Sequence, residues 1–343
     1  MAKIAVIGAG AWGTGIAIAL GRKGSHAVRL WAYEPEVKAS ILDHRMNDLF
    51  LPEAAIPETV APTNSLAEAL DGAEIVVSVM PSHHVRRIYR QMKPYLRREV
   101  LYVSATKGVE DQTLLRMSEV IGEIAGEGPE GFAPRLGVLS GPCFAKEVAR
   151  GLPTAVTIAS QDAELAGIVQ REFSDPNFRV YRNTDIAGVE LGGSLKNVIA
   201  IAAGIAEGLK LGHNTTAALI TRGLAEITRL ALVCGGRPET MAGLAGLGDL
   251  VLTCTGGLSR NRTVGVALGE GGKLAEIIAG MHGMVAEGVL TTRAAVGLAA
   301  RHHVEMPICA QMFEILEHDK PPMQALHELM TRPAAAEVSL QQS

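Results

Sequence analysis

One lysine stands in an unusually apolar part of the sequence. Lys196 lies in ELGGSLKNVIA, residues 190–200, and the next charged residue downstream is Glu207. If this stretch is helical, it is apolar or small on nearly every side, which is typical of a buried helix. A buried ammonium is unfavourable unless it is paired or used in chemistry, so Lys196 is a candidate catalytic residue. The alternative is a structural lysine whose charged end reaches the surface.

Two glycine-spaced stretches downstream contain further candidate site residues. GLAGLGDL, residues 243–250, presents Asp249, which would pair with Lys196 and orient it, or would instead cap a helix. SRNR, residues 259–262, follows two glycines and offers a hydroxyl, a guanidinium and an amide in one short segment. That set suits a phosphate or a carboxylate, and a solvated basic loop is the alternative.

Two further candidates follow strand-like runs. SATKG, residues 104–108, contains Lys107, and SGPCFA, residues 140–145, contains Cys143. Because open α/β sheets bind ligands at the carboxyl ends of their strands, Lys107 would contact a substrate anion or the amide of a cofactor, unless it is a surface lysine. No histidine is evidently paired with Cys143, which favours packing or substrate contact over covalent catalysis.

A glycine motif near the N-terminus gains its meaning from its context. GAGAWG, residues 8–13, directly follows an apolar strand-like run and precedes a helical pattern. In that context Gly8 permits a tight turn, Gly10 leaves room for a pyrophosphate, and Gly13 allows close packing of helix and strand. The helix N-terminus would then offer free N–H groups to the phosphates. The motif predicts a dinucleotide site, and a glycine-rich turn without a ligand is the alternative.

The end of the second strand selects between NAD and NADP in such sites. An acid there accepts the 2′-hydroxyl of NAD, and an arginine favours the 2′-phosphate of NADP. Glu34 follows Gly13 by about 21 residues, which fits a hydroxyl acceptor, although a solvated turn acid is the alternative. Arg29 lies on the strand itself and is a weaker phosphate candidate. These residues favour NAD with tolerance of NADP.

The first half of the chain alternates apolar strand-like runs with helical patterns. Strands are predicted at residues 3–7, 28–33, 74–80, 99–105, 136–140, 154–159 and 178–182. Helices are predicted between the first five strands, at residues 13–23, 65–70 and 85–95 among others. This alternation is typical of an α/β fold in which helices cover both faces of a parallel sheet.

After about residue 185 the pattern is helical throughout. Helices are predicted at residues 186–209, 215–233, 264–268, 273–279, 291–301 and 309–318. Asn214 is the expected N-cap of the second of these helices, and Glu226 is expected on its polar face. The chain divides into three expected parts: a dinucleotide-binding domain at residues 1–185, a helical substrate-binding domain at residues 186–331, and a flexible tail at residues 332–343.

The composition argues against several classes of protein. The 343 residues carry a net charge of −4 without a basic block, so no nucleic-acid partner is expected. The cysteines are widely spaced and no His or Cys pattern has metal-ligand spacing, so we expect neither disulfides nor a metal site. No apolar run reaches the roughly 20 residues of a membrane span, and the N-terminal run lacks a signal-peptide pattern. A cytoplasmic protein without membrane insertion is expected.

Eight segments resemble one family closely. They are GAGAWGT (8–14), VMPSHHVR (79–86), SATKGVE (104–110), SGPCFAKEV (140–148), ELGGSLKNVIAIAAGIAEGL (190–209), ITRGLAEITRL (220–230), GLAGLGDLVLTCTGGLSRNR (243–262) and VAEGVLTT (285–292). In these segments, and in their order, the chain resembles the bacterial-type NAD(P)-dependent glycerol-3-phosphate dehydrogenases. The Lys-Asn helix followed by AGLGDL and SRN is far more specific than the glycine motif alone.

The resemblance implies a fold and a reaction. The fold is a Rossmann-like, mostly parallel sheet domain followed by an all-α domain of the 6-phosphogluconate-dehydrogenase-like type. The reaction is reduction of dihydroxyacetone phosphate at C2 with NAD(P)H, giving sn-glycerol 3-phosphate for phospholipid synthesis, with Lys196 as proton donor and acceptor at the C2 oxygen. The residue chemistry agrees, because an ammonium can protonate an alkoxide directly and a phosphate dianion requires Arg-type recognition.

The resemblance also assigns site residues by position. Catalytic roles fall on Lys196, Asp249 and Lys107. Substrate contacts fall on Lys107, Gly141, Cys143, Lys196, Asn197, Asp249, Thr253, Ser259, Arg260 and Asn261. Contacts to NAD or NADP fall on Gly8, Gly10, Ala11, Trp12, Gly13, Tyr33, Lys107, Ala145, Arg260, Val285 and Glu287.

Three residues depart from the family pattern. Ala11 replaces a serine and removes one phosphate hydrogen bond, Tyr33 replaces an Arg or His near the adenosine ribose, and Cys143 replaces a Ser or Thr that contacts substrate. Two other functions are compatible with the residues: a dehydrogenase of a small 2-oxo or 3-hydroxy acid, and a nicotinamide-sensing protein without turnover, which would not require Lys196. The small-residue helices would form either a homodimer surface or the core of a monomer.

Overall fold

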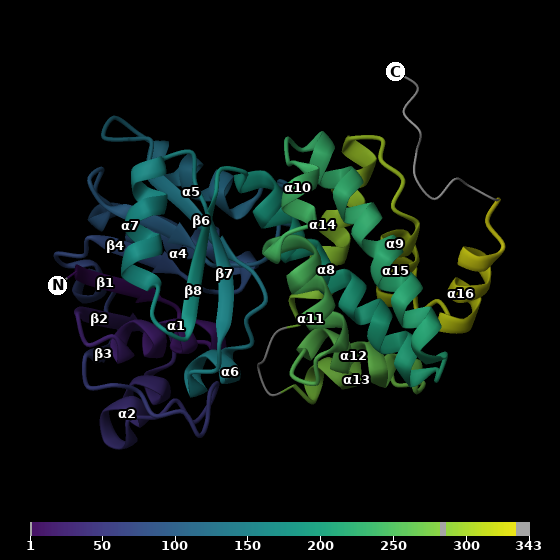
Figure 1. Ribbon diagram of the computed structural model, residues 1–343, viewed down its shortest axis with the longest axis horizontal. Helices are drawn as coiled ribbons and strands as arrows, with labels where there is room; N and C mark the ends of the chain where they lie inside the picture. Colours follow the sequence, from purple (N-terminus) through teal and green to yellow (C-terminus); the bar gives the residue numbers. More distant parts are fainter. Residues whose placement is uncertain (1, 282–285, 334–343) are drawn as a thin grey trace.

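The N-terminal half of the chain builds one eight-stranded sheet in the order β3-β2-β1-β4-β5-β6-β7-β8. The computed structural model describes residues 2–281 and 286–333. The strands are β1 (Ala2–Ile7), β2 (His26–Trp31), β3 (Val60–Thr63), β4 (Ile75–Ser78), β5 (Leu101–Ser104), β6 (Arg135–Ser140), β7 (Thr154–Ala159) and β8 (Phe178–Asn183). All neighbours pair in parallel except β6 and β7. The prediction of a mostly parallel sheet is therefore confirmed (Figure 1).

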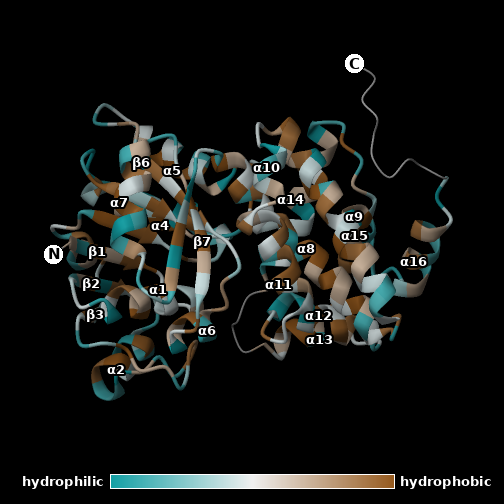
Figure 2. Ribbon diagram, viewed as in Figure 1, coloured by the Kyte–Doolittle hydropathy of each residue, from teal (hydrophilic) through white to brown (hydrophobic). Residues whose placement is uncertain are grey.

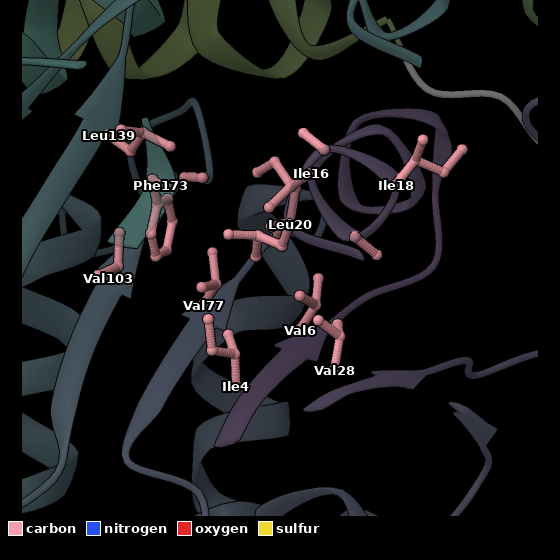
Figure 3. Packing of buried hydrophobic residues seen from close by; sticks show 14 of the residues in the cluster. Ile4, Val6, Ile16, Ile18, Leu20, Val28, Val77, Val103, Leu139 and Phe173 are labelled. Atoms are coloured by element: carbon pink, nitrogen blue, oxygen red, sulfur yellow. The ribbon is translucent and has the colours of Figure 1, made fainter. Parts of the chain in front are cut away.

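Alternate residues of each strand enter cores on opposite faces of the sheet, as the period of two requires. In β1, Ile4 and Val6 pack with Leu20 of α1 on one face (Figure 3), whereas Ala5 and Ile7 enter the other core. The helices contributing to the first core are α1 (Ala11–Arg22), α2 (Pro35–His44), α6 (Ala145–Arg150) and α7 (Ala163–Phe173). Those contributing to the second are α3 (Leu66–Leu70), α4 (Val85–Met92) and α5 (Met117–Gly126).

The C-terminal half is helical and is organised around α8 (Ile186–Gly208). The remaining helices are α9 (Gly212–Val233), α10 (Pro238–Met241), α11 (Asp249–Thr255), α12 (Arg260–Gly269), α13 (Leu274–Ala279), α14 (Glu287–Arg301), α15 (Pro307–His318) and α16 (Pro322–Met330). Helix α12 packs closely on α8, because a Cβ on Gly265 would overlap the carbonyl oxygen of Ile201. Apolar segments run through both halves in Figure 2, in the sheet on one side and in the helices around α8 on the other.

Helix α8 is buried along nearly its whole length, from Ala187 to Ala206. Among the described residues, α8 and one bent pair, Pro238–Thr255 with Arg260–Gly269, are long and apolar enough to cross a membrane. However, 89% of the apolar stretch of α8 is buried inside the protein, which is typical of a core helix. The buried, largely apolar helix predicted around Lys196 is thus present in the structure.

Several elements differ from those predicted from sequence. Strand β3 was not expected, since it has only four residues and one of them is Pro62. Helix α9 begins at Gly212, so the prediction of Asn214 as its N-cap is wrong. Helices α12 and α14 begin earlier than predicted, which places Arg260 and Glu287 in their first turns. The tail predicted at residues 332–343 falls almost wholly outside the described residues.

Candidate active site

The glycine-rich turn joins β1 to α1 in the middle of the sheet. Gly8 has a φ of 119°, which favours glycine, and a Cβ there would overlap the carbonyl oxygen of Val79. A Cβ on Gly13 would overlap the carbonyl oxygen of Gly8. At Gly10, by contrast, a Cβ would meet nothing within 4 Å. Packing therefore requires the first and third glycines, while the second faces open space.

This open space fits the pyrophosphate of a dinucleotide. Ala11 and Trp12 begin α1, whose first-turn N–H groups have no intrahelical acceptors and carry a partial positive charge. The turn also lies between β2 and β4, where the strand order reverses and open α/β sheets bind nucleotides. The Nε1 of Trp12 is buried and has no hydrogen-bond partner among the described residues. The sheet edge thus has the features expected of a nucleotide cradle.

The chain just beyond β2 presents an exposed aromatic side chain. Tyr33 is 60% exposed, and Glu34 is the N-cap residue of α2 without a side-chain cap hydrogen bond. Arg29 donates to the carbonyl oxygens of Glu68 and, at 3.0 Å, of Asp71. Its side chain is therefore tied to the α3 segment. This argues against Arg29 as a partner of the 2′-phosphate of NADP, the role considered for it from the sequence.

Two lysines from different halves of the molecule meet at one buried carboxylate. Lys196 Nζ on α8 donates to Asp249 Oδ1 at 2.6 Å, and Lys107 Nζ, in the loop after β5, donates to Asp249 Oδ2 at 2.6 Å. Asp249 is 1% exposed and opens α11 after a π-helical turn, Leu244–Gly248. The Thr253 hydroxyl, one turn along α11, accepts from Lys196 Nζ at 2.7 Å. The pairing expected between Lys196 and Asp249 is therefore present.

Burial and neighbouring charges shift the pKa values of the two lysines in opposite directions. Desolvation, together with the Lys107 ammonium, lowers the pKa of Lys196 to about 8, although the Asp249 carboxylate opposes the shift. Desolvation also acts on Lys107, but the Asp249 carboxylate outweighs it and raises the pKa of Lys107. Lys107 therefore remains an ammonium, while Lys196 can release and accept a proton near neutral pH.

Gly141 and Cys143 border the same cluster. Lys107 Nζ donates to the Gly141 carbonyl oxygen at 3.3 Å and lies 3.9 Å from Cys143 Sγ. The Cys143 thiol itself donates to the Gly141 carbonyl at 3.0 Å. Desolvation raises the pKa of this thiol, so it stays protonated, as expected for a residue that is not a nucleophile. Asn197 lies next to Lys196 on α8 and is buried.

The SRN segment forms the N-terminus of α12. The Ser259 side chain caps this helix by accepting from Arg262 N at 3.2 Å. Asn261 Oδ1 accepts from Gly288 N at 2.9 Å and so holds the start of α14. Arg260 is exposed and makes no hydrogen bond or ion pair with a described residue. The segment thus presents, on a fixed helix end, one guanidinium that has no hydrogen-bond partner among the described residues and interacts electrostatically with Glu287.

Glu287 links the two halves of the molecule. It opens α14, and its carboxylate accepts from Ser82 N at 3.3 Å and from Ser82 Oγ at 3.0 Å, just beyond β4. Burial raises the pKa of Glu287 to about 7 against the opposing effects of Ser82 and Arg260. Ala145 begins α6 and packs against α1 at Gly15. Val285 lies outside the described residues.

Sequence reasoning missed two serines that position this site. Ser82 holds Glu287, and its place in the loop that follows β4 at the carboxyl edge of the sheet was the available signal. Ser194 Oγ accepts from Gly108 N at 2.8 Å and donates to the Glu190 carbonyl at 2.7 Å. Ser194 thereby ties the Lys107 loop to α8, but a serine inside a helical pattern gives no such signal.

The nucleotide cradle on a mostly parallel sheet, joined to a buried lysine on a central helix, defines a two-domain nucleotide-dependent dehydrogenase. The family model for the N-terminus of NAD-dependent glycerol-3-phosphate dehydrogenase matches residues 3–166, and the model for its C-terminus matches residues 185–327. The chain therefore belongs to the NAD-dependent glycerol-3-phosphate dehydrogenase family, which confirms the resemblance seen in its motifs.

Individual relatives agree with this assignment. The chain is 70% identical over 340 residues to the glycerol-3-phosphate dehydrogenase (NAD(P)+) of Koribacter versatilis, covering 99% of this chain and 100% of the relative. It is 56% identical to the protein of the same name from Acidobacterium capsulatum, covering 98% and 100%. The crystal structure of glycerol-3-phosphate dehydrogenase from Coxiella burnetii superposes with a TM-score of 0.91 at 42% identity, covering 96% and 99%.

Proposed function

We propose that this chain reduces dihydroxyacetone phosphate to sn-glycerol 3-phosphate with NADH or NADPH. The observation that carries the proposal is the buried cluster in which Asp249 binds both Lys196 and Lys107. The substrate and the cofactors are inferred from the names of the relatives at 70% and 56% identity, both glycerol-3-phosphate dehydrogenase (NAD(P)+). The glycine-rich turn beside β1 supplies a place for the nucleotide.

The cofactor, when bound, supplies a hydride to the carbonyl carbon of the substrate. Lys196 donates a proton to the C2 oxygen as negative charge develops there, and in the reverse direction the neutral amine takes that proton back. A pKa of about 8 suits both directions, because both protonation states are accessible near neutral pH. Asp249 holds Lys196 in place. Lys107 stabilises the developing charge without losing its own proton.

The substrate phosphate needs donors that are not already committed. The guanidinium of Arg260 meets this requirement, and it stands in the first turn of α12 where the helix dipole also favours an anion. Ser259 and Asn261 hold the helix ends around it. We assign the remaining substrate contacts to Gly141, Cys143, Asn197 and Thr253.

The nucleotide would be bound mainly by residues 1–185, and the substrate mainly by residues 186–331. The proposed cofactor contacts are Gly8, Gly10, Ala11, Trp12, Gly13, Tyr33, Lys107, Ala145, Arg260, Val285 and Glu287. Such an enzyme would act in the cytoplasm and supply glycerol 3-phosphate for phospholipid synthesis. The proposed assembly is a homodimer through small-residue helices, which the mass of the purified protein in solution would test.

The direct test is oxidation of NADH and NADPH by purified protein supplied with dihydroxyacetone phosphate, followed by absorbance. Turnover with at least one cofactor is expected, and no oxidation with either would contradict the proposal. A panel of small 2-oxo acids serves as the control, because Arg260 would also accept a carboxylate. Preference for a 2-oxo acid would indicate the related dehydrogenase, and binding of cofactor without any turnover would indicate a sensor.

A further inference from the structure

Strand β2 brings no free guanidinium to the nucleotide edge of the sheet. Tyr33, just beyond the end of β2, is 60% exposed, and Arg29 is held by the α3 segment, with Asp71 Oδ2 3.7 Å from its Nη1. Of the side chains on β2 and just beyond it, only Glu34 would then be available to bind the adenosine ribose. That would favour NAD and would leave the 2′-phosphate of NADP without a partner.

A guanidinium from α4 nevertheless lies beside the end of β2. The Cζ of Arg87, on α4, lies 5.4 Å from the centroid of the Tyr33 ring, which is cation–π geometry. Arg87 makes no hydrogen bond or ion pair with any described residue. The other two arginines of α4 are engaged: Arg86 is bound by Glu110 and Glu123, and Arg90 lies 3.9 Å from Glu127.

Tyr33 and Arg87 come from the two sides of the glycine-rich turn. Strand β1 lies between β2 and β4, and Gly8 N donates to the Trp31 carbonyl at 3.1 Å on the β2 side. On the β4 side, the Gly8 backbone packs directly on Val79. Arg87 lies on α4, after β4, and stands over Tyr33, the second residue beyond β2. The pair therefore stands beside the turn at its β2 side, where the adenosine ribose of a dinucleotide lies.

We propose that Arg87, standing on the Tyr33 ring, binds the 2′-phosphate of NADP(H) in this chain. The guanidinium fork matches a phosphate, and no ion pair has to be broken to free it. The Tyr33 ring fixes its orientation, and Glu34 on the same edge accepts the 2′-hydroxyl when the phosphate is absent. Arg87 thereby determines whether the chain can use NADPH in addition to NADH. This inference depends on the dinucleotide site of the proposed function.

The test compares two probes that differ only in the 2′-phosphate. Calorimetric titration of the full chain with adenosine 2′,5′-bisphosphate and with AMP measures the contribution of the 2′-phosphate to binding affinity, and it requires no turnover. Arg87→Ala should weaken the bisphosphate about ten- to a hundredfold, the scale of lost charge-assisted hydrogen bonds, and should leave AMP within about twofold. Arg90→Ala, on the same helix, is the matched control and should change neither. Tyr33→Phe should keep the selectivity, and Tyr33→Ala should reduce it.

Each other outcome contradicts a different statement. An equal loss for both probes would place Arg87 on the adenine or the 5′-phosphate and would overturn the inference. An unchanged bisphosphate affinity in a variant with native circular dichroism would also overturn it. If the wild-type chain bound neither probe and no NADH, the dinucleotide site itself would be wrong, and the inference would fail with the proposed function.

Discussion

Lys196 and Lys107 bind opposite oxygens of one carboxylate, Asp249 Oδ1 and Oδ2, each at 2.6 Å. Lys107 belongs to the sheet half and Lys196 to the helical half, so the cluster forms only where the two halves meet. With both amines protonated, two ammonium groups share one carboxylate, which leaves an excess positive charge in a buried place. Such a site attracts an anionic substrate and stabilises negative charge on a carbonyl oxygen.

The role of Lys196 is tested by its removal and by pH. Lys196→Ala should lower kcat for reduction about a hundred- to ten-thousandfold, the usual contribution of a general acid, while NADH binding is retained. In the wild type, the rate of reduction should fall as pH rises through about 8, since the ammonium that donates the proton is lost. Steady-state kinetics and NADH fluorescence check both. Turnover within about tenfold of wild type, roughly 1.4 kcal/mol of barrier, would exclude Lys196 as the acid.

Asp249 is expected to matter for stability as well as for turnover. Asp249→Asn leaves two neighbouring ammonium groups without their buried countercharge, so unfolding free energy should fall by about 3–5 kcal/mol and the basic limb of the pH profile should move to lower pH. Glu317→Gln removes the partner of Arg293 in a surface pair with an N···O distance of 2.7 Å, and should change stability by about 0–1 kcal/mol. Equal effects of the two substitutions in urea unfolding would contradict the buried pairing.

Sequence reasoning located the buried lysine because its signal is local. The apolar run around Lys196 predicted a core helix, and a buried ammonium needs a countercharge, which Asp249 provides. The family resemblance assigned Lys107 to the same centre, but the residue pattern alone did not predict its approach to this carboxylate. This approach depends on how the loop after β5 meets α11, and no spacing in the sequence encodes the packing of two distant elements.

For Glu226, the local sequence pattern gave a wrong prediction. Its spacing predicted a solvated polar face on α9, but it is 2% exposed and accepts from Ile308 N at 2.8 Å and from Cys309 N at 3.2 Å. The carboxylate satisfies the free N–H groups at the start of α15. A helix end that lies 82 positions further along the chain cannot be read from the periodicity of α9.

The glycine-rich turn allows packing and binding to be separated. Gly13→Ala places a methyl group against the Gly8 carbonyl oxygen and should destabilise the fold. Gly10→Ala meets no protein atom within 4 Å and has an extended backbone with φ of −64°, so stability should be nearly unchanged. Its methyl group would instead occupy space needed by the pyrophosphate, and NADH affinity should fall. Thermal unfolding and NADH titration check both, and normal NADH affinity in Gly10→Ala would contradict the cradle.

The half-buried carboxyl of Glu287 should make folding depend on pH. Its pKa is raised from 4.5 to about 7, so between these values the folded chain keeps a proton that the unfolded chain releases. The stabilising contribution is full below 4.5 and is lost as pH rises to about 7. Glu287→Gln, which can still accept from Ser82, should therefore gain stability relative to wild type between pH 5 and pH 8 in urea unfolding. Glu58→Gln, whose carboxylate is 87% exposed, should show no such gain. Parallel pH curves for wild type and Glu287→Gln would show that Glu287 is ionised in the folded protein throughout this range.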